Sequence, residues 1–459
     1  MPFKLTQLLY PFYRLGERFS QGIRRRITEA GWFFIAVTFV LGLAGMDTNY
    51  SLHYQIFSAL LMILVLAILV LLIQRRPNLQ VQRVCPRFAT AGVDLRYPVH
   101  IRNASRYALY DVRLREWLPD ALPSKAEFVN RTEPGERRRN LFDRVFVYYR
   151  WMWLVATKRL AHSEPSDSLE LAPESQQRLM MTLKPSRRGV LPLNRLRVLA
   201  RDPFGLFQRA RPVQCSPNSI LVLPRRYPIG PLDLPGKRQL DELGAGVVAS
   251  SVGQSDEFIG LRDYRPGDPP RHIHWRSWAR LNRPVVKEYE EETFPRYALA
   301  LDTVLDPDQD DEVFEEAVSV AASFVSSVDT RESLLDLLFV AGKAYCFSMG
   351  GPGAGPASEK MLEVLATVQP STNAEQLIKL KRSVLRRASS ISASILVFTG
   401  WCDERQALVR DLRAHGVICI VFVITSKARK PEAGTNFLEV NDIATGLASF
   451  QANHTAGAA

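Results

Sequence analysis

Cysteine is scarce in this chain of 459 residues. The five cysteines, Cys85, Cys215, Cys346, Cys402 and Cys419, lie far apart, and no two of them form a CxxC pair. An odd, scattered set argues against a disulfide framework or a zinc site and fits a reducing compartment. We expect these thiols to be small apolar residues of the core.

The usual sequence marks of an enzyme are also missing. The chain has no GxSxG nucleophile motif and no paired Cys and His. Its glycine-rich run at residues 350–355 lacks the Lys-Ser or Lys-Thr that completes a phosphate loop. We therefore expect a protein that is not an enzyme and that needs no cofactor.

Acidic residues are outnumbered by basic ones, 47 against 59, which gives a net charge of +12. Such an excess points to an anionic partner, namely nucleic acid, acidic lipid or acidic protein. The basic residues cluster beside the hydrophobic runs, where membrane topology requires them, so we expect no nucleic-acid partner. The length predicts two or three domains.

The longest hydrophobic run covers residues 56–73, eighteen positions without one charge. At about 1.5 Å per residue, a helix of this length reaches roughly 27 Å, close to the apolar thickness of a bilayer. Residues 32–46 form a shorter apolar run that contains Gly42 and Gly45. Because the second run follows so closely, we interpret the pair as a transmembrane hairpin over residues 31–73 and not as a signal peptide.

Basic residues flank both ends of this hairpin. Before it come Lys4, Arg14, Arg18, Arg24, Arg25 and Arg26, and after it come Arg75, Arg76, Arg83 and Arg87, whereas the connecting loop has none. The positive-inside rule then predicts that both ends of the chain face the cytoplasm. We expect a multi-pass protein of a bacterial inner (plasma) membrane, with residues 1–30 as a basic cytoplasmic segment.

Residues 80–225 consist mostly of short alternating runs broken by Gly, Pro, Asn and Asp. The clearest runs cover residues 94–101, 110–114 and 178–183. They predict antiparallel strands in a sandwich-like domain. A basic and aromatic insertion at residues 135–160 leaves two interpretations open: a helix that lies in the lipid headgroup layer, or a helix that packs its aromatic rings on the sandwich.

The C-terminal half begins with a region over residues 226–295 that contains a Pro- and Gly-rich linker at residues 226–246. Over residues 296–450, apolar strand runs alternate with helical patterns, which predicts a doubly wound parallel sheet. Strands are expected at residues 297–301, 334–340, 395–398, 417–424 and 437–440, and helices at residues 311–328, 358–368, 374–387 and 404–415. Residues 451–459 are expected to be a tail.

The most specific-looking stretch covers residues 258–292 and reads FIGLRDYRPGDPPRHIHWRSWARLNRPVVKEYEEE. Its Arg-Pro-Gly-Asp sequence predicts a turn, after which Asp268 is placed to cap a short helix that starts at Pro269. Trp275 and Trp278 fall on one apolar face of that helix. Arg283-Pro284 then ends the helix, and a strand follows.

This stretch closely resembles the signature of the domain-of-unknown-function family number 58. The shared pattern is an aromatic residue, glycine and arginine, then a tyrosine-containing RPGD-like turn, I-x-W and an Ala-Arg pair. Residues 201–207 (RDPFGLF), followed by residues 221–225 (LVLPR), are similar to the family's upstream element. His274 is one departure, because many members carry Asp before the tryptophan.

The resemblance implies an architecture and a role. The architecture is two N-terminal spans, a β-rich part and a von Willebrand factor A-like C-terminal domain. The role is that of a membrane-anchored scaffold, the partner of a MoxR-type AAA ATPase in the assembly or maturation of protein complexes.

The signature supplies the candidate partner-binding or structural residues, which are Arg262, Tyr264, Gly267, Asp268, Trp275, Arg276, Trp278 and Arg280. Two interpretations of them stay open. They form an internal lattice of ion pairs that fixes geometry, or they form a docking surface, in which Arg and Trp commonly dominate.

A von Willebrand A-like domain also raises the question of a metal-ion-dependent adhesion site, which needs Asp-x-Ser-x-Ser after the first strand. This chain retains Asp302, but Val304 offers no side-chain oxygen and Asp306 replaces the second serine. Thr372, Thr399 and Asp403 supply later oxygens without restoring the pattern. Magnesium at Asp302 and Asp306 would make the domain a divalent-metal-dependent ligand-binding module, the alternative function.

Overall fold

The structure is a computed structural model in which the described residues are 2–44, 51–74, 77–133, 135–230, 252–293, 295–306, 309–328, 333–350, 357–426 and 432–456. The chain divides into two compact units, Met1–Leu223 and Pro224–Ala459. Most of the expected linker, at residues 226–246, lies outside the described residues. Its first part is described and binds the second unit, since Tyr227 N donates to Ser323 Oγ at 2.8 Å.

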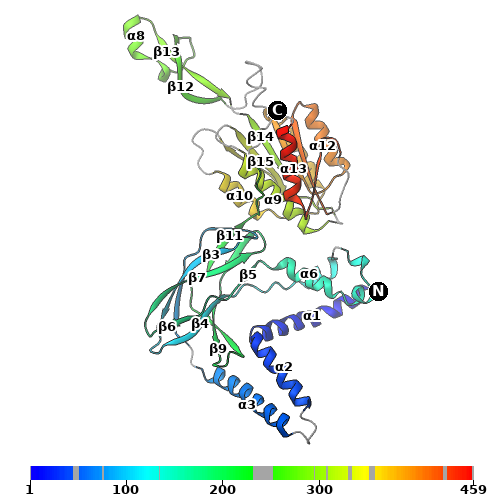
Figure 1. Cartoon of the computed structure of the whole chain (residues 1–459). Coiled ribbons are helices and arrows are strands. Elements are labelled where there is room, and N and C mark those ends of the chain that lie inside the picture. The colour runs from blue at the N-terminus through cyan, green and yellow to red at the C-terminus, as the bar shows by residue number, and fades with distance from the viewer. Residues whose placement is uncertain are drawn as a thin grey trace. The chain divides into compact units, whose positions relative to one another are not determined.

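Three helices begin the first unit: α1 (Pro2–Arg24), α2 (Glu29–Ala44) and α3 (Ser51–Ile73). Among the described helices only α3, over Leu52–Ile73, is both long and apolar enough to cross a membrane, because the equally apolar α2 has 16 residues. Gly42 of α2 lies against the ring of Phe57, and Phe34 packs near Leu64. The two apolar helices therefore run antiparallel along each other (Figure 1).

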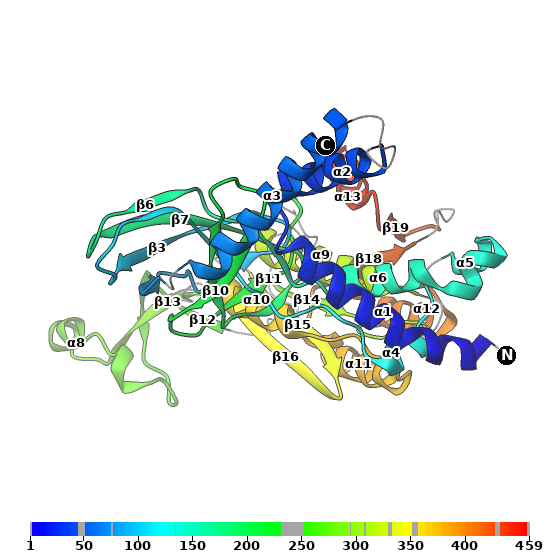
Figure 2. The same ribbon diagram turned by 90° about the horizontal axis from the view of Figure 1, so that it is seen from below.

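The basic and aromatic insertion is not the single helix that the sequence predicts. It contains a 3₁₀ turn (Glu136–Arg138), α5 (Leu141–Phe146) and α6 (Tyr148–Lys158), and the chain bends between α5 and α6 at Val147, whose φ is 50°. The aromatic residues of α6 pack on α1 and on α4 (Lys125–Asn130) instead of on the strands. Trp151 stacks on Tyr13 of α1, with ring centroids 5.8 Å apart. The ribbons of α1 and α6 lie near each other in Figures 1 and 2.

Eleven strands among the described residues complete the first unit. They are β1 (Leu79–Arg83), β2 (Phe88–Thr90), β3 (Leu95–Asn103), β4 (Leu109–Glu116), β5 (Ala161–Ser163), β6 (Leu169–Leu171), β7 (Gln176–Pro185), β8 (Gly189–Leu193), β9 (Leu196–Arg201), β10 (Gln208–Val213) and β11 (Asn218–Leu223). They form sheets in the orders β1-β3-β7-β5, β10-β9-β4-β6 and β2-β11-β8, which surround one apolar core. The predicted β-rich region is confirmed, and the pairing is antiparallel except between β2 and β11.

The second unit begins with a two-stranded arm, defined as residues 252–293. It consists of β12 (Val252–Asp263), a 3₁₀ turn (Pro270–His272), the short helix α8 (Trp275–Leu281) and β13 (Val285–Thr293). Strands β12 and β13 pair antiparallel with each other. The predicted helix end is confirmed, because Asn282 follows α8 in the left-handed conformation and Pro284 precedes β13.

The rest of the second unit is a six-stranded sheet with helices. Its strands are β14 (Arg296–Leu301), β15 (Leu334–Ala341), β16 (Lys343–Gly350), β17 (Ala393–Phe398), β18 (Ile418–Thr425) and β19 (Asn436–Glu439), in the order β16-β15-β14-β17-β18-β19. All neighbours are parallel except β15 and β16. Every strand that the sequence predicts here is present, whereas the antiparallel edge strand β16, visible beside β15 in Figure 2, was not predicted.

Helices cover both faces of this sheet. Leu380 of α11 (Glu375–Leu385) and Leu408 of α12 (Asp403–Ala414) share a buried cluster with Val421 of β18. Phe422, the next residue of β18, instead packs its ring on Phe324 of α9 (Asp311–Ser327) and on Phe450 of α13 (Ile443–Ala456), at 5.0 and 4.9 Å. Successive residues of a strand point to opposite faces, so α11 and α12 cover one face and α9 and α13 the other.

Four of these helices were predicted: α9, α10 (Ala357–Thr367), α11 and α12. Helix α13 is new, and it continues into residues 451–459, which we expected to be a tail.

The turn after β9 holds the apolar helices on the strands of the first unit. Asp202 accepts from the amides of Phe204 and Phe207, at 2.9 and 2.5 Å, and thereby closes the turn. Thr28, at the start of α2, donates through Oγ1 to the Leu206 carbonyl at 2.9 Å and accepts at the same oxygen from the Gly31 amide at 3.0 Å. Thr28 therefore caps α2, and the RDPFGLF element positions the start of this helix.

Gly31 is required at this junction because no side chain fits there. A Cβ atom would lie 2.1 Å from the Leu206 carbonyl oxygen. We expect Gly31→Ala to separate α2 from the turn at a cost of about 1–3 kcal/mol. In the full-length protein in detergent, trypsin should then cut faster after Arg201 and Arg209. The matched control is Gly16→Ala in α1, where the added Cβ would meet nothing within 4 Å. Equal cleavage of the two variants would contradict the assignment.

Candidate functional site

The RPGD sequence of the arm forms the predicted turn, but Asp268 does not cap a helix. Its carboxylate accepts both Arg262 Nη1 and Arg262 Nη2, at 2.7 and 2.8 Å, and also the amide of Arg265 at 2.8 Å. Gly267 has a φ of 109°, which only glycine adopts easily. The hydrogen bonds to Arg262 and Arg265 hold the pKa of Asp268 at about 2. Asp268 therefore acts as an ion-pair partner inside the arm.

Helix α8 starts later than the sequence predicts, with His274 at its N-cap. The reason is that the His274 amide is engaged by the Val285 carbonyl at 2.8 Å, which ties the segment before α8 to β13. The two predicted tryptophans do lie together, since the rings of Trp275 and Trp278 stack with centroids 5.2 Å apart. Trp275 is nevertheless 62% exposed.

The eight signature residues thus fall into two groups. Arg262, Gly267 and Asp268 build the turn, and Tyr264 joins it to the second strand, because its amide donates to the Pro284 carbonyl at 3.0 Å. The other group is on α8, where Arg276 and Arg280 are exposed together with Trp275, and Trp278 is half-buried. The ion-pair interpretation therefore fits the turn, and the docking interpretation fits α8.

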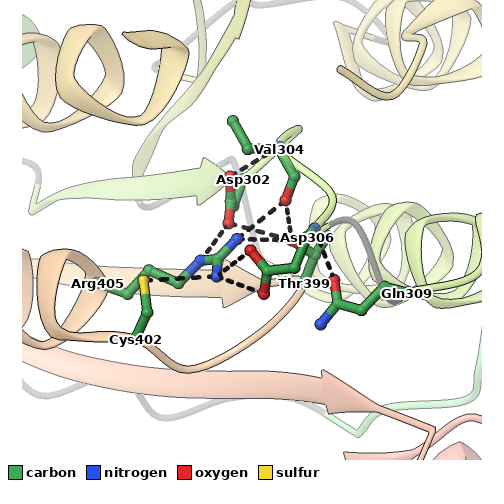
Figure 3. A network of polar contacts seen from close by, with 7 residues as sticks. All are labelled: Asp302, Val304, Asp306, Gln309, Thr399, Cys402 and Arg405. Atoms are coloured by element: carbon green, nitrogen blue, oxygen red, sulfur yellow. Dashed lines mark hydrogen bonds and ion pairs between the residues drawn. The ribbon is translucent and has the colours of Figure 1, made fainter. Parts of the chain in front are cut away.

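The candidate metal residues lie at the carboxyl ends of the central strands of the sheet. Asp302 follows β14 and Thr399 follows β17. From β14 the chain adds β15 and β16 on one side and then β17, β18 and β19 on the other, so the boundary between β14 and β17 is a topological switch point. Ligands of open α/β sheets commonly bind at such a point. Here a side chain of the protein itself occupies it, the guanidinium of Arg405 from the first turn of α12 (Figure 3).

Arg405 contacts the two segments that follow β14 and β17. Its Nε donates to Asp302 Oδ2 at 2.8 Å, its Nη1 lies 3.1 Å from Asp306 Oδ2, and its Nη2 donates to the Val304 carbonyl at 2.9 Å. Thr399 Oγ1 accepts from Nη2 at 3.2 Å and donates to the same Val304 carbonyl. The side chains of Arg405 and Asp302 are 1% and 0% exposed, whereas that of Asp306 is 44% exposed.

The buried carboxylate of Asp302 has its counter-charge inside the protein, in Arg405. Burial raises the pKa of Asp302, and the Arg405 guanidinium, the Val304 amide and the Thr399 hydroxyl oppose it. Burial acts to lower the pKa of Arg405, but Asp302 and Asp306 outweigh it, so its pKa lies above the ordinary value. Gly400 leaves room for the pair, because a Cβ there would lie 2.6 Å from Asp306 Oδ2.

This geometry bears on the expected metal site. Both predicted metal residues, Asp302 and Asp306, are engaged by a guanidinium, and Val304 contributes its backbone carbonyl to that cation instead of a side-chain oxygen to a metal. The described part of the chain contains no group of three or more His, Cys, Asp or Glu residues that could hold a metal ion. Magnesium at this place stays a prediction that the described geometry does not favour.

Sequence reasoning missed Arg405, although it noted Thr399. Arg405 stands 103 positions after Asp302, in a helix whose other charged residues are mostly exposed. Two features of the sequence could have indicated it. Asp302 lacks the serines of an adhesion site, and Arg405 lies in the first turn of a predicted helix. Where the serine ligands are missing, an arginine in a nearby helix can neutralise the aspartate in place of a metal ion.

Removing the guanidinium tests this replacement. Arg405→Met leaves the buried Asp302 carboxylate without its cation, which typically costs about 3–5 kcal/mol. We expect the thermal midpoint of the full-length protein in detergent, followed by intrinsic fluorescence, to fall by several degrees. Arg410→Met, at an exposed position of the same helix, is the control and should have little effect. Similar midpoints for both variants would show that Arg405 does not stabilise the unit.

Comparison with known proteins gives one informative match. No curated protein matches the chain. The CARDB domain of a Pyrococcus furiosus protein, solved with di-metal ions, is 10% identical with a TM-score of 0.15, over 30% of this chain and 89% of that domain. An exo-β-N-acetylglucosaminidase of family GH20 from Vibrio harveyi is 9% identical with a TM-score of 0.15, over 76% of this chain and 57% of that enzyme. Likeness at this level carries no argument about fold or activity.

The family model is the match that bears on the signature. It covers the end of β12, α8, β13 and the six-stranded sheet, and so includes both the RPGD turn and the Arg405 centre. Residues 260–450 match the family described as "Protein of unknown function DUF58", and this match supports the family that the signature resembles.

Proposed function

We propose that the protein is a membrane-anchored scaffold that presents its second unit and its arm to a cytoplasmic protein partner. The carrying observation is the apolar surface of the first unit. The apolar part of α3, Leu52–Ile73, has 22 residues, and only 11% of its most apolar 18-residue stretch is buried by the rest of the protein. So large an exposed apolar surface suits lipid and not water. Helix α2 beside it forms the other helix of a membrane hairpin.

Helix α1 supports the same location. Four large apolar residues, Leu8, Phe12, Leu15 and Phe19, follow one another at helical spacing and are 63–72% exposed. Tyr10 and Tyr13, which pack against α6, point to the other side of α1. A helix with an exposed apolar stripe and basic flanks lies in the plane of a membrane interface. Together with the basic residues at both ends of the hairpin, it supports the proposal that both termini lie in the cytoplasm of a bacterial cell.

The partner surface that we propose is α8. Exposed aromatic and arginine side chains such as Trp275 and Arg276 are frequent hot spots of protein interfaces. The parallel sheet with one antiparallel edge fits a von Willebrand A-like domain, and the family resemblance names a MoxR-type AAA ATPase as the partner, in complex assembly or maturation. The protein is not an enzyme in this proposal. A metal-dependent ligand-binding module is the alternative, and Arg405 argues against it.

Membrane anchoring is tested by charging the middle of α3. Each arginine at the centre of a span costs about 2.5–3.5 kcal/mol of insertion free energy. We expect the wild-type chain to stay in the membrane pellet after an alkaline carbonate wash, and Val65→Arg with Leu69→Arg to release it. Tyr54→Arg, near the start of α3, is the control and should stay in the pellet. Release of the wild-type chain by the wash would contradict the anchor.

The partner is tested by capture on the full-length protein in detergent. We expect an AAA ATPase, identified by mass spectrometry, to co-purify with the wild type and to fall at least about tenfold with Trp275→Ala and Arg276→Glu, since hot-spot truncations cost about 2 kcal/mol each. Arg410→Glu is the control for a change of surface charge on the same unit. Capture that is absent from the wild type, or equal in the α8 variant, would refute the ATPase proposal.

A further inference from the structure

A cavity of about 650 Å³ lies in the first unit between the ends of α1 and α3 and the first residues of β9 and β10. We call it the arginine pocket. Its wall contains five arginines, which are Arg18, Arg25, Arg26, Arg197 and Arg209, and Asp120 is the one acidic residue among its described lining residues. The lining therefore carries an excess of four positive charges.

The arginines of this pocket are crowded and incompletely neutralised. Arg25 lies 3.4 Å from Asp120, a long ion pair between partly exposed side chains. Arg25 and Arg197 also lie over the same ring, that of Trp117, at 4.0 and 3.7 Å from its centroid. Burial and then the neighbouring Arg25 and Arg195 lower the pKa of Arg197. Positive charges held this close favour the binding of an anion between them.

The other side of the arginine pocket is apolar and belongs to the helix that we propose spans the membrane. Ile68, Leu71 and Leu72 at the end of α3 line it, together with Phe207 from the turn that docks α2. Ile68 and Leu72 remain 45% and 65% exposed. Their position is the end of an uncharged span, which is where the hydrocarbon of a bilayer meets the headgroups.

The two walls together select a ligand with a negative head and apolar chains. A free phosphate would contact the arginines and leave the α3 side uncovered, and an apolar ligand would leave the arginines without an anion. Basic pockets beside membrane helices on the cytoplasmic side bind the headgroups of acidic lipids. The basic end of α1 lines part of the pocket. The exposed apolar side chains of α1 point away from α6.

We propose that the arginine pocket binds one acidic phospholipid of the cytoplasmic leaflet, with its phosphate among Arg25, Arg197 and Arg209 and its acyl chains along α3. This inference rests on the proposed membrane anchor. It adds to the anchor a specific lipid site, formed jointly by α1, α3 and the β9–β10 strands.

The test uses native mass spectrometry of the full-length protein released from detergent with added lipid. Phosphatidylglycerol is the acidic probe, phosphatidylcholine the neutral one and inorganic phosphate the free anion. We expect one phosphatidylglycerol to be retained in preference to phosphatidylcholine and not to be displaced by millimolar phosphate. Arg197→Gln with Arg209→Gln should lower its occupancy about tenfold or more, because each cation near an acidic headgroup contributes about 1 kcal/mol.

Two further variants separate the lipid site from general charge and from misfolding. Arg102→Gln with Arg178→Gln removes two exposed arginines from β3 and β7 and should leave lipid occupancy unchanged. Arg197→Lys with Arg209→Lys keeps the charges and should retain most of the binding. Equal loss in the Arg102 and Arg178 variant, no preference between the two lipids, or displacement by phosphate would overturn the site. A wild-type chain that stays in carbonate-washed membranes but shows no preference refutes only the lipid site, whereas a chain that the wash releases refutes the anchor.

Discussion

The first unit depends on the contact between Thr28 and the turn at residues 202–207. Thr28 caps α2 and donates to the Leu206 carbonyl with the same hydroxyl, so the helix start and the turn share one hydrogen-bonded junction. A short antiparallel bridge between Ile27 and Phe207 continues it. Because Leu206 and Phe207 then pack with Leu64 and Ala67 of α3, the junction fixes both apolar helices on the β-rich part.

The second unit is organised around a different constraint, a buried charge that needs a partner. Asp302 is fully buried at the end of β14, and an unpaired carboxylate there would be very costly. A metal ion with hydroxyl ligands would be one way to neutralise such a carboxylate, but Val304 has no hydroxyl to offer. Arg405 satisfies the carboxylate from α12 and joins the segments after β14 and β17. The consequence is a cation held by the chain itself, which fixes the geometry of these loops.

Both units also present surfaces that the strands and helices do not cover. In the first unit, apolar stripes of α1 and α3 accompany arginines, which suits the boundary between hydrocarbon and headgroups. In the second, the RPGD turn uses its charges internally, whereas α8 exposes Trp275 and its arginines. This division assigns the turn residues of the signature to internal ion pairs and leaves the α8 residues exposed, where we propose that a partner binds.

The sequence by itself determined the local elements, because hydrophobic periodicity is a local property. The uncharged run before residue 74, the alternating strands and the succession of strands and helices after residue 296 all follow from it. The tertiary structure decided which distant residues meet, namely Arg405 with Asp302 and the turn after β9 with Thr28. It made Asp268 an ion-pair partner of Arg262 in place of a helix cap. It also decided β16, an antiparallel edge strand, and α13, whose small and polar residues show little periodicity. Long-range pairing leaves no periodic trace along the chain, since it depends on how strands and helices close on one another in space.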